Sequence, residues 1–260
     1  MSVPPSCAIA FAYGLFIGSF LNVCILRLPR GESIVKPPSH CTSCGEPLKP
    51  WHNIPLLSYL FLRGRCRTCG IPFSSRYFWV ELLTGLGVGF LFCRLGLSLE
   101  FFVSALFFAL LVVIFFIDLD HQLILDSTSF LGIALGLLSS LFRGIFWDAL
   151  IGVLVSAALF YVIAIVSVRA FQKEGMGGGD VKLAALIGAF LGWKLALLSF
   201  FVSFFLGAVV GIALMAARII RRKEYIPFGP FMAVGAMVAY LWGAEILNWY
   251  FSRTWGMTYY

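Results

Sequence analysis

Two aspartates, Asp118 and Asp180, have the residue type and setting for acid–base chemistry at a membrane surface. Asp118 follows an apolar run in FIDLDHQLILD, and Asp180 follows the glycines of GMGGGD. Two carboxylates a few ångströms apart share one proton, so one can activate water while the other donates to a carbonyl. This is aspartic peptidase chemistry, which needs no metal and no nucleophilic side chain.

Asp180 has two other interpretations. A phosphate-binding loop is less convincing, because GMGGGD lacks the lysine and hydroxyl of GxxxxGK[ST]. A helix cap suits an isolated aspartate before an apolar helix. A second acid, Asp118, expected at the same membrane face, favours the paired-carboxylate interpretation. The glycines would also let an extended substrate backbone approach closely.

A second set of residues predicts a metal site. Two CxxC pairs, CTSC and CRTC, supply Cys41, Cys44, Cys66 and Cys69. Four thiolates at this spacing favour a closed, structural zinc site. Two disulfides are the alternative, but basic flanks predict that this segment lies in the reducing cytosol. His40 and His52 are interpreted as ordinary loop residues.

The elements that position these residues are membrane helices. The chain has 260 residues, 61% of them hydrophobic and 12% charged, with a mean hydropathy of +0.96, so we expect an all-α polytopic membrane protein. The first segment is expected to be retained, because it lacks the basic start and cleavage site of a signal peptide. About eight segments are predicted, at 5–26, 78–96, 98–118, 128–143, 147–168, 181–193, 195–219 and 228–248.

Basic residues predict the orientation. With the N-terminus outside, fifteen of the 19 lysines and arginines lie inside, and only four lie outside: Arg94, Arg143, Lys194 and Arg253. Residues 27–77 then form a cytoplasmic zinc insert between a first helix (1–26) and a membrane peptidase core (78–260). The basic excess suits anionic lipid heads, and no pattern predicts nucleic-acid binding.

Four smaller expectations concern packing and charge. Gly14 and Gly18 should allow close helix contact. Glu81 is a further polar group near the inner face. Lys182 is expected to meet lipid phosphate in preference to forming a salt bridge with Asp180. The remaining cysteines are interpreted as packing residues of apolar helices: Cys7, Cys24 and Cys93.

Taken together, the motifs resemble those of the bacterial type IV prepilin peptidases, a family of GxGD intramembrane aspartic peptidases. The resemblance spans nearly the whole chain and rests on GSFLNVCILRLPR, the paired CxxC motifs, PWHNIPLLSYL, SRYFWVELLTG, IDLDHQLILD, KEGMGGGDVKL and IPFGPFMAVGA. It implies that Asp118 and Asp180 form the catalytic pair. One departure is Leu125, where the family usually has proline before the acid corresponding to Asp126.

The resemblance also implies substrates and a second activity. Members remove a short basic leader from prepilins and pseudopilins at the cytoplasmic face of the inner membrane. Many then N-methylate the new N-terminus with S-adenosylmethionine, and the four-cysteine insert is similar to that of the two-activity form. No S-adenosylmethionine-binding residues can be assigned from the sequence.

Two other functional classes remain open at this stage. In a proton-coupled transporter the same acids would relay protons, although they are expected at one face and not at the midplane. Alternatively, the zinc insert would be a docking module of a secretion assembly without catalysis.

Overall fold

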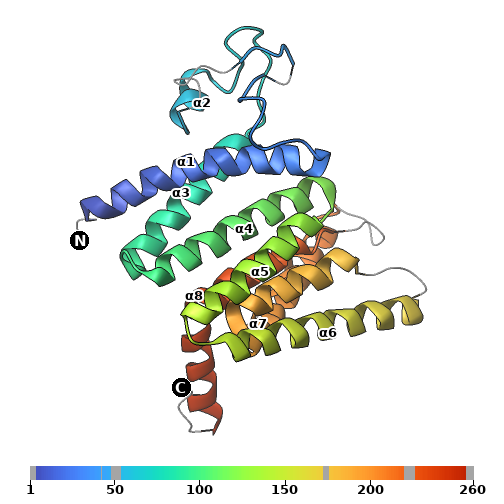
Figure 1. The fold of residues 1–260 in the computed structure, drawn as a ribbon. Helices are drawn as coiled ribbons and strands as arrows, with labels where there is room; N and C mark the ends of the chain where they lie inside the picture. Colours follow the sequence, from blue (N-terminus) through green and yellow to red (C-terminus); the bar gives the residue numbers. More distant parts are fainter. Residues whose placement is uncertain (1–3, 42, 48–53, 172–175, 220–225, 256–260) are drawn as a thin grey trace. The chain divides into compact units, whose positions relative to one another are not determined.

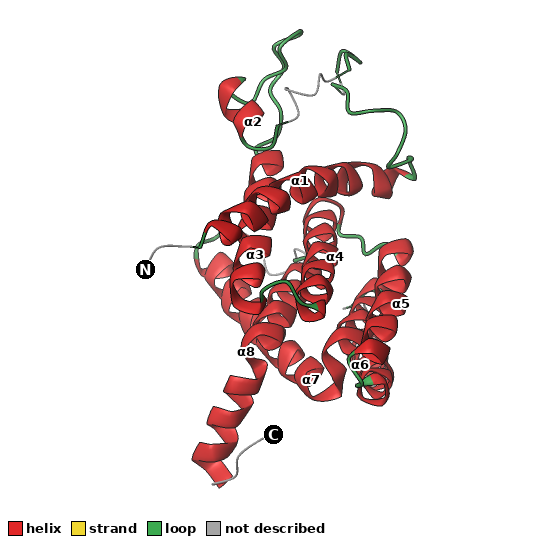
Figure 2. Ribbon diagram, turned by 60° about the vertical axis from the view of Figure 1, so that its left-hand side comes forward, coloured by secondary structure: helices red, strands yellow, loops and turns green. Residues whose placement is uncertain are grey.

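The structure is a computed structural model that describes residues 4–41, 43–47, 54–171, 176–219 and 226–255. Its regular elements in these ranges are all helical (Figures 1 and 2). They are α1 (Pro5–Arg27), the 3-10 helix η1 (Leu28–Arg30), α2 (Leu57–Phe61), α3 (Arg76–Leu95), α4 (Leu99–His121), α5 (Asp126–Phe142), α6 (Phe146–Phe171), α7 (Gly178–Ala216) and α8 (Gly229–Trp255).

Six of the described helices are long and apolar enough to cross a membrane, and α5 is a shorter apolar helix. The all-α polytopic fold is therefore confirmed. Six of the predicted segments each correspond to one helix, whereas 181–193 lies within α7 and 195–219 overlaps its remainder, which ends at Ala216.

Helix α7 consists of two arms that meet at Gly192, whose backbone is not helical (φ 71°, ψ 172°). Gly192 lies beside Asp148, near the start of α6. Eight residues later, the ring of Phe200 lies 4.7 Å from that of Phe160. Asp148 and Phe160 are roughly 18 Å apart along α6 at 1.5 Å per residue. A straight α7 would continue beyond the start of α6 and carry Phe200 away from Phe160. The contact between the two rings therefore shows that the chain reverses direction at Gly192.

By packing, the chain forms two compact units, residues 1–113 and 114–260. In the first unit, α1 and α3 are antiparallel, since Asn22 Nδ2 donates to the Tyr77 carbonyl (3.0 Å) at one end. A Cβ added at Gly14 would lie 2.9 Å from Gly85 Cα, and one at Gly18 would lie 2.7 Å from Glu81 Cα. The predicted close approach at these two glycines is therefore confirmed.

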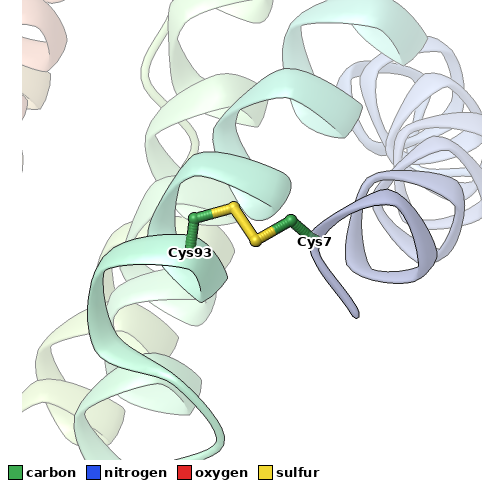
Figure 3. Close-up of a disulfide and its surroundings, with 2 residues drawn as sticks. All are labelled: Cys7 and Cys93. Carbon is green, nitrogen blue, oxygen red and sulfur yellow. A yellow bond between two sulfur atoms is a disulfide. The ribbon is translucent and has the colours of Figure 1, made fainter. Parts of the chain in front are cut away.

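The other end of this helix pair is closed by a disulfide between Cys7 of α1 and Cys93 of α3, with Cα atoms 5.5 Å apart (Figure 3). The interpretation of these two cysteines as packing residues was wrong. Sequence could not reveal the bond, because it depends on the register of two helices 86 residues apart. Cys24 is a free buried thiol, as expected.

In the second unit, the first arm of α7 forms the centre of the core. Ala184, Leu186, Ile187, Ala189 and Phe190 have no exposed surface. A helix that is apolar on all sides is stable only when it is surrounded, and α5, α6 and α8 all pack against α7. Asp180 therefore lies at the beginning of the most enclosed helix segment of this unit.

Candidate active site and metal centre

Asp118 is a buried carboxylate near the C-terminal end of α4, with 5% of its surface exposed. Its Oδ2 accepts a hydrogen bond from the backbone N–H of Gly229, at 2.9 Å. Gly229 is the first residue of α8, where backbone amides have no partner within the helix and the helix dipole favours a negative charge. The beginning of α8 thus holds this carboxylate in place.

Asp180 lies in the first turn of α7 and is equally buried, with 5% of its surface exposed. Its Oδ2 accepts the backbone N–H of Gly177, the N-cap residue, at 3.0 Å, and its own N–H donates to the Gly177 carbonyl at 3.1 Å. The N-cap of α7 is Gly177 and Asp180 is the third residue of the helix, so the interpretation of Asp180 as the N-cap was wrong. Its contact with the Gly177 N–H does not exclude a chemical role. Gly175, the first glycine of GMGGGD, lies outside the described residues.

The two acids belong to the same compact unit. Each uses one carboxylate oxygen to accept a glycine amide. Among the described residues, the second oxygen of each acid has no hydrogen-bond partner. Two buried carboxylates in one unit, each with one oxygen available, are the groups that a shared proton and a bound water require.

The chain entering α5 borders this pair. Leu125 has φ −74°, close to the value that proline imposes, so the path is kept without the proline. A Cβ added at Gly179 would lie 2.8 Å from Cβ of Ile124, which explains a glycine there. Lys182 forms an ion pair with Asp126, so its expected role as a lipid-phosphate contact was wrong.

The four cysteines come together in the first unit. Each CxxC pair forms the same turn: Gly45 N–H donates to the Cys41 carbonyl and Gly70 N–H donates to the Cys66 carbonyl, both at 2.9 Å. Both glycines have φ near +70° (72° and 71°), a conformation that favours glycine. These repeated turns are what a four-cysteine zinc site requires.

The sulfur atoms have the spacing that zinc needs. All four lie within 4.8 Å of one another, with Cys41–Cys69 at 3.9 Å and Cys44–Cys66 at 4.0 Å. A tetrahedral zinc with Zn–S bonds of about 2.3 Å places its sulfurs roughly 3.8 Å apart. The set therefore fits zinc after a contraction of at most about 1 Å. His40 contacts the Pro38 carbonyl instead, and His52 lies outside the described residues.

Backbone amides prepare two of the thiols to bind metal. The N–H groups of Cys69 and then Thr68 lower the pKa of Cys66 to about 6. The N–H groups of Cys44 and Ser43 lower the pKa of Cys41 in the same way. Because thiolates are the form that binds zinc, each turn stabilises one thiolate before the metal arrives.

Sequence reasoning missed a cavity of about 750 Å³ in the first unit. It is lined by residues of α1, η1, the cysteine turns, α2 and the start of α3, including Asn22, Arg27, Tyr59, Cys66 and Glu81. Glu81 Oε2 accepts the backbone N–H of Leu56 at 2.8 Å. The only signal in the sequence was Glu81, a carboxylate in an otherwise apolar helix.

Comparison with known proteins agrees with this arrangement. Residues 12–95 match the bacterial peptidase A24 N-terminal domain, and residues 105–212 match the type IV leader peptidase family. No solved structure matches the chain significantly.

Several relatives are named prepilin leader peptidase/N-methyltransferase. The protein from Aeromonas hydrophila is 36% identical, covering 95% of this chain and 94% of the relative. That from Bacillus subtilis is also 36% identical, covering 96% and 99%. That from Myxococcus xanthus is 44% identical over 80% of this chain, which spans 62% of that relative's length. Both family models match, and the Aeromonas hydrophila and Bacillus subtilis proteins align with this chain over more than 90% of both sequences. The chain therefore belongs to the type IV leader peptidase family.

Proposed function

We propose that this protein cleaves the leader from type IV prepilins or pseudopilins with Asp118 and Asp180, and then N-methylates the new N-terminus. The observation that carries the peptidase assignment is the presence in one compact unit of two buried carboxylates, each held by one glycine amide. Family membership carries the two activities together.

Cleavage follows from the shared proton. The ionised aspartate takes a proton from water, whose oxygen attacks the scissile carbonyl, while the protonated aspartate donates to the carbonyl oxygen. The resulting tetrahedral centre, which carries two hydroxyls, collapses when its C–N bond breaks: the leaving nitrogen takes a proton from the pair, and one hydroxyl returns its proton to the pair as the C=O bond re-forms. One water is consumed, and the two carboxyls again share one proton.

The substrate fits a site at the end of membrane helices. A basic leader followed by an apolar helix rests with its cleavage point at the inner bilayer surface. We place the site at the cytoplasmic face because the segments that flank Asp118 and Asp180 belong to the side that holds fifteen of the 19 lysines and arginines. Within the first unit, the cysteine cluster needs a reducing compartment, whereas the Cys7–Cys93 disulfide suits an oxidising one. Cys7 precedes Asn22 by about 22 Å of helix, so the two cysteine chemistries belong to opposite ends of the α1–α3 pair.

Methylation belongs to the first unit in this proposal. S-adenosylmethionine, when bound, supplies a methyl group that passes to the free amine, which loses a proton to water as the sulfonium becomes a neutral thioether. Zinc, held by the four cysteines, folds the insert and takes no part in the transfer, because four protein ligands leave no open position. The transporter hypothesis finds no support in the comparisons or in the placement of the acids.

Gly229 provides a direct test of how Asp118 is held. A Cβ at this position would lie 2.6 Å from Asp118 Oδ2, so Gly229→Ala must displace the carboxylate. We expect kcat for cleavage to fall by about 10- to 100-fold with little change in KM, since the chemistry and not binding is affected. Gly207→Ala is the control, because its Cβ would meet only ordinary contacts, at 3.5 Å and beyond. Equal kcat values for both variants would contradict this role.

Mass spectrometry tests the two activities together. A prepilin is incubated with S-adenosylmethionine and the purified protein in lipid nanodiscs. It should lose its leader, and the new N-terminus should gain one methyl group, a mass increase of about 14 Da. Without S-adenosylmethionine only the first change is expected. An uncut prepilin would exclude the peptidase function, and a cut, unmethylated one would exclude the methyltransferase.

A further inference from the structure

The cavity of the first unit contains a carboxylate that accepts hydrogen bonds but has no counter-charge, and an amide oxygen without a donor, among the described residues. Glu81 is 9% exposed, and it has no cationic partner among the described residues. Asn22 uses its Nδ2 to bond Tyr77, but its buried Oδ1 has no hydrogen-bond partner in the described structure. Buried charges and polar atoms are costly when unpaired. The cavity therefore has room for a ligand that brings a cation to Glu81 and a hydrogen-bond donor to Asn22 Oδ1.

We propose that this cavity is the S-adenosylmethionine site of the chain, with the carboxylate of Glu81 facing positive charge on the methyl donor. The inference rests on the proposed methyltransferase function and adds the residues that would carry it. S-adenosylmethionine is unusual among cofactors in having two cationic groups, a sulfonium and an ammonium, next to one carboxylate and a flat base. The cavity offers a partner for each of these groups.

Size and lining agree with such a ligand. Its volume of about 750 Å³ lies within the usual range for small-molecule sites, about 300–1,000 Å³. Arg27 and Arg30 line it and can bind a carboxylate. Tyr59 offers an aromatic ring to a cation or a base, and Gly64 keeps that ring in place, since a Cβ there would lie 2.8 Å from it. Asn22 Oδ1 can accept from an N–H or O–H of the donor.

The site also explains why the zinc cluster and the membrane helices need each other. Cys66 is both a member of the cluster and a lining residue, while Asn22 and Glu81 lie on α1 and α3. Glu81 joins the two parts through the Leu56 amide. A site closed on one side by the insert and on the other by helices is complete only when zinc has folded the insert.

The decisive variant is Glu81→Gln, tested by calorimetric binding of S-adenosylmethionine to the full chain in nanodiscs. Glutamine keeps the volume and an oxygen for the Leu56 amide, but it removes the charge. We expect at least about tenfold weaker binding, a loss of about 1.4 kcal/mol. Asn22→Ala should weaken binding too. Prepilin cleavage should be unchanged in both, which shows that each variant is folded. Glu245→Gln, an exposed acid on α8, is the charge-matched control and should bind normally.

The outcomes separate this inference from the proposed function. Wild-type affinity in both cavity variants, with a wild-type chain that binds and transfers methyl, would place the donor elsewhere and leave the methyltransferase intact. A wild-type chain that neither binds nor transfers would overturn both. Ultraviolet crosslinking of radiolabelled S-adenosylmethionine adds an independent readout. Label should appear in peptides of residues 19–30 or 58–81, and label confined to residues 114–260 would contradict the site.

Discussion

Asp118→Asn and Asp180→Asn should each reduce prepilin cleavage by at least about 1,000-fold. Asparagine keeps the shape of the side chain and an oxygen that can accept the glycine amide from Gly229 or Gly177. What it removes is the shared proton, because an amide neither takes a proton from water nor donates one as a carboxylic acid does. Single-turnover cleavage of a labelled prepilin measures the loss of chemistry separately from substrate binding.

Two controls make this result specific to the pair. Asp120→Asn changes an exposed acid two residues from Asp118 and should leave most of the activity. Methylation of a substrate that has already been cut should persist in both the Asp118→Asn and Asp180→Asn variants, since the cavity of the first unit is unchanged. Cleavage within tenfold of wild type in either variant would remove the two-carboxylate mechanism.

Cys41→Ser should abolish zinc binding, lowering the metal content from about one zinc per chain to none. The serine hydroxyl does not ionise at neutral pH, so the site loses one of four thiolates and the folding free energy that zinc supplies to the insert. Because Cys66 lines the cavity as well, methylation and S-adenosylmethionine binding should be lost with the metal. Elemental analysis of the purified protein, together with the mass of the processed substrate, measures both effects.

Cys24→Ser is the matched control, because Cys24 is a free cysteine of α1 outside the cluster. It should keep zinc and both activities. Cleavage should also survive in Cys41→Ser, since Asp118 and Asp180 belong to the other compact unit. An unchanged zinc content in Cys41→Ser would show that these four sulfurs are not the ligands.

Features that depend on local sequence could be predicted. Long apolar runs predict helices because the bilayer leaves no other way to pair backbone groups, and all the expected membrane segments correspond to described helices. The cysteine cluster could be predicted from spacing, because a CxxC turn brings its own two sulfurs together. The grouping of Asp118 and Asp180 in one unit agrees with the expectation that the end of one helix and the beginning of another lie at the same membrane face.

Features that depend on register between distant helices could not be predicted. The Cys7–Cys93 bond, the Gly229 amide on Asp118 and the Lys182–Asp126 ion pair each join segments more than 50 residues apart. Their residues have ordinary local explanations, and one sequence contains no signal that selects the partner. The same holds for the cavity, whose walls come from several short segments that carry no binding motif.

The reversal at Gly192 has a consequence for the lipid around the enzyme. The first arm of α7, from Gly178 to the turn, is only roughly 21 Å long, whereas bilayer hydrocarbon is about 30 Å thick. Its two ends cannot both reach bulk water unless the bilayer is locally compressed or one end remains submerged. The thickness of the membrane, which depends on acyl-chain length, therefore determines the depth in the bilayer at which a scissile bond meets Asp180.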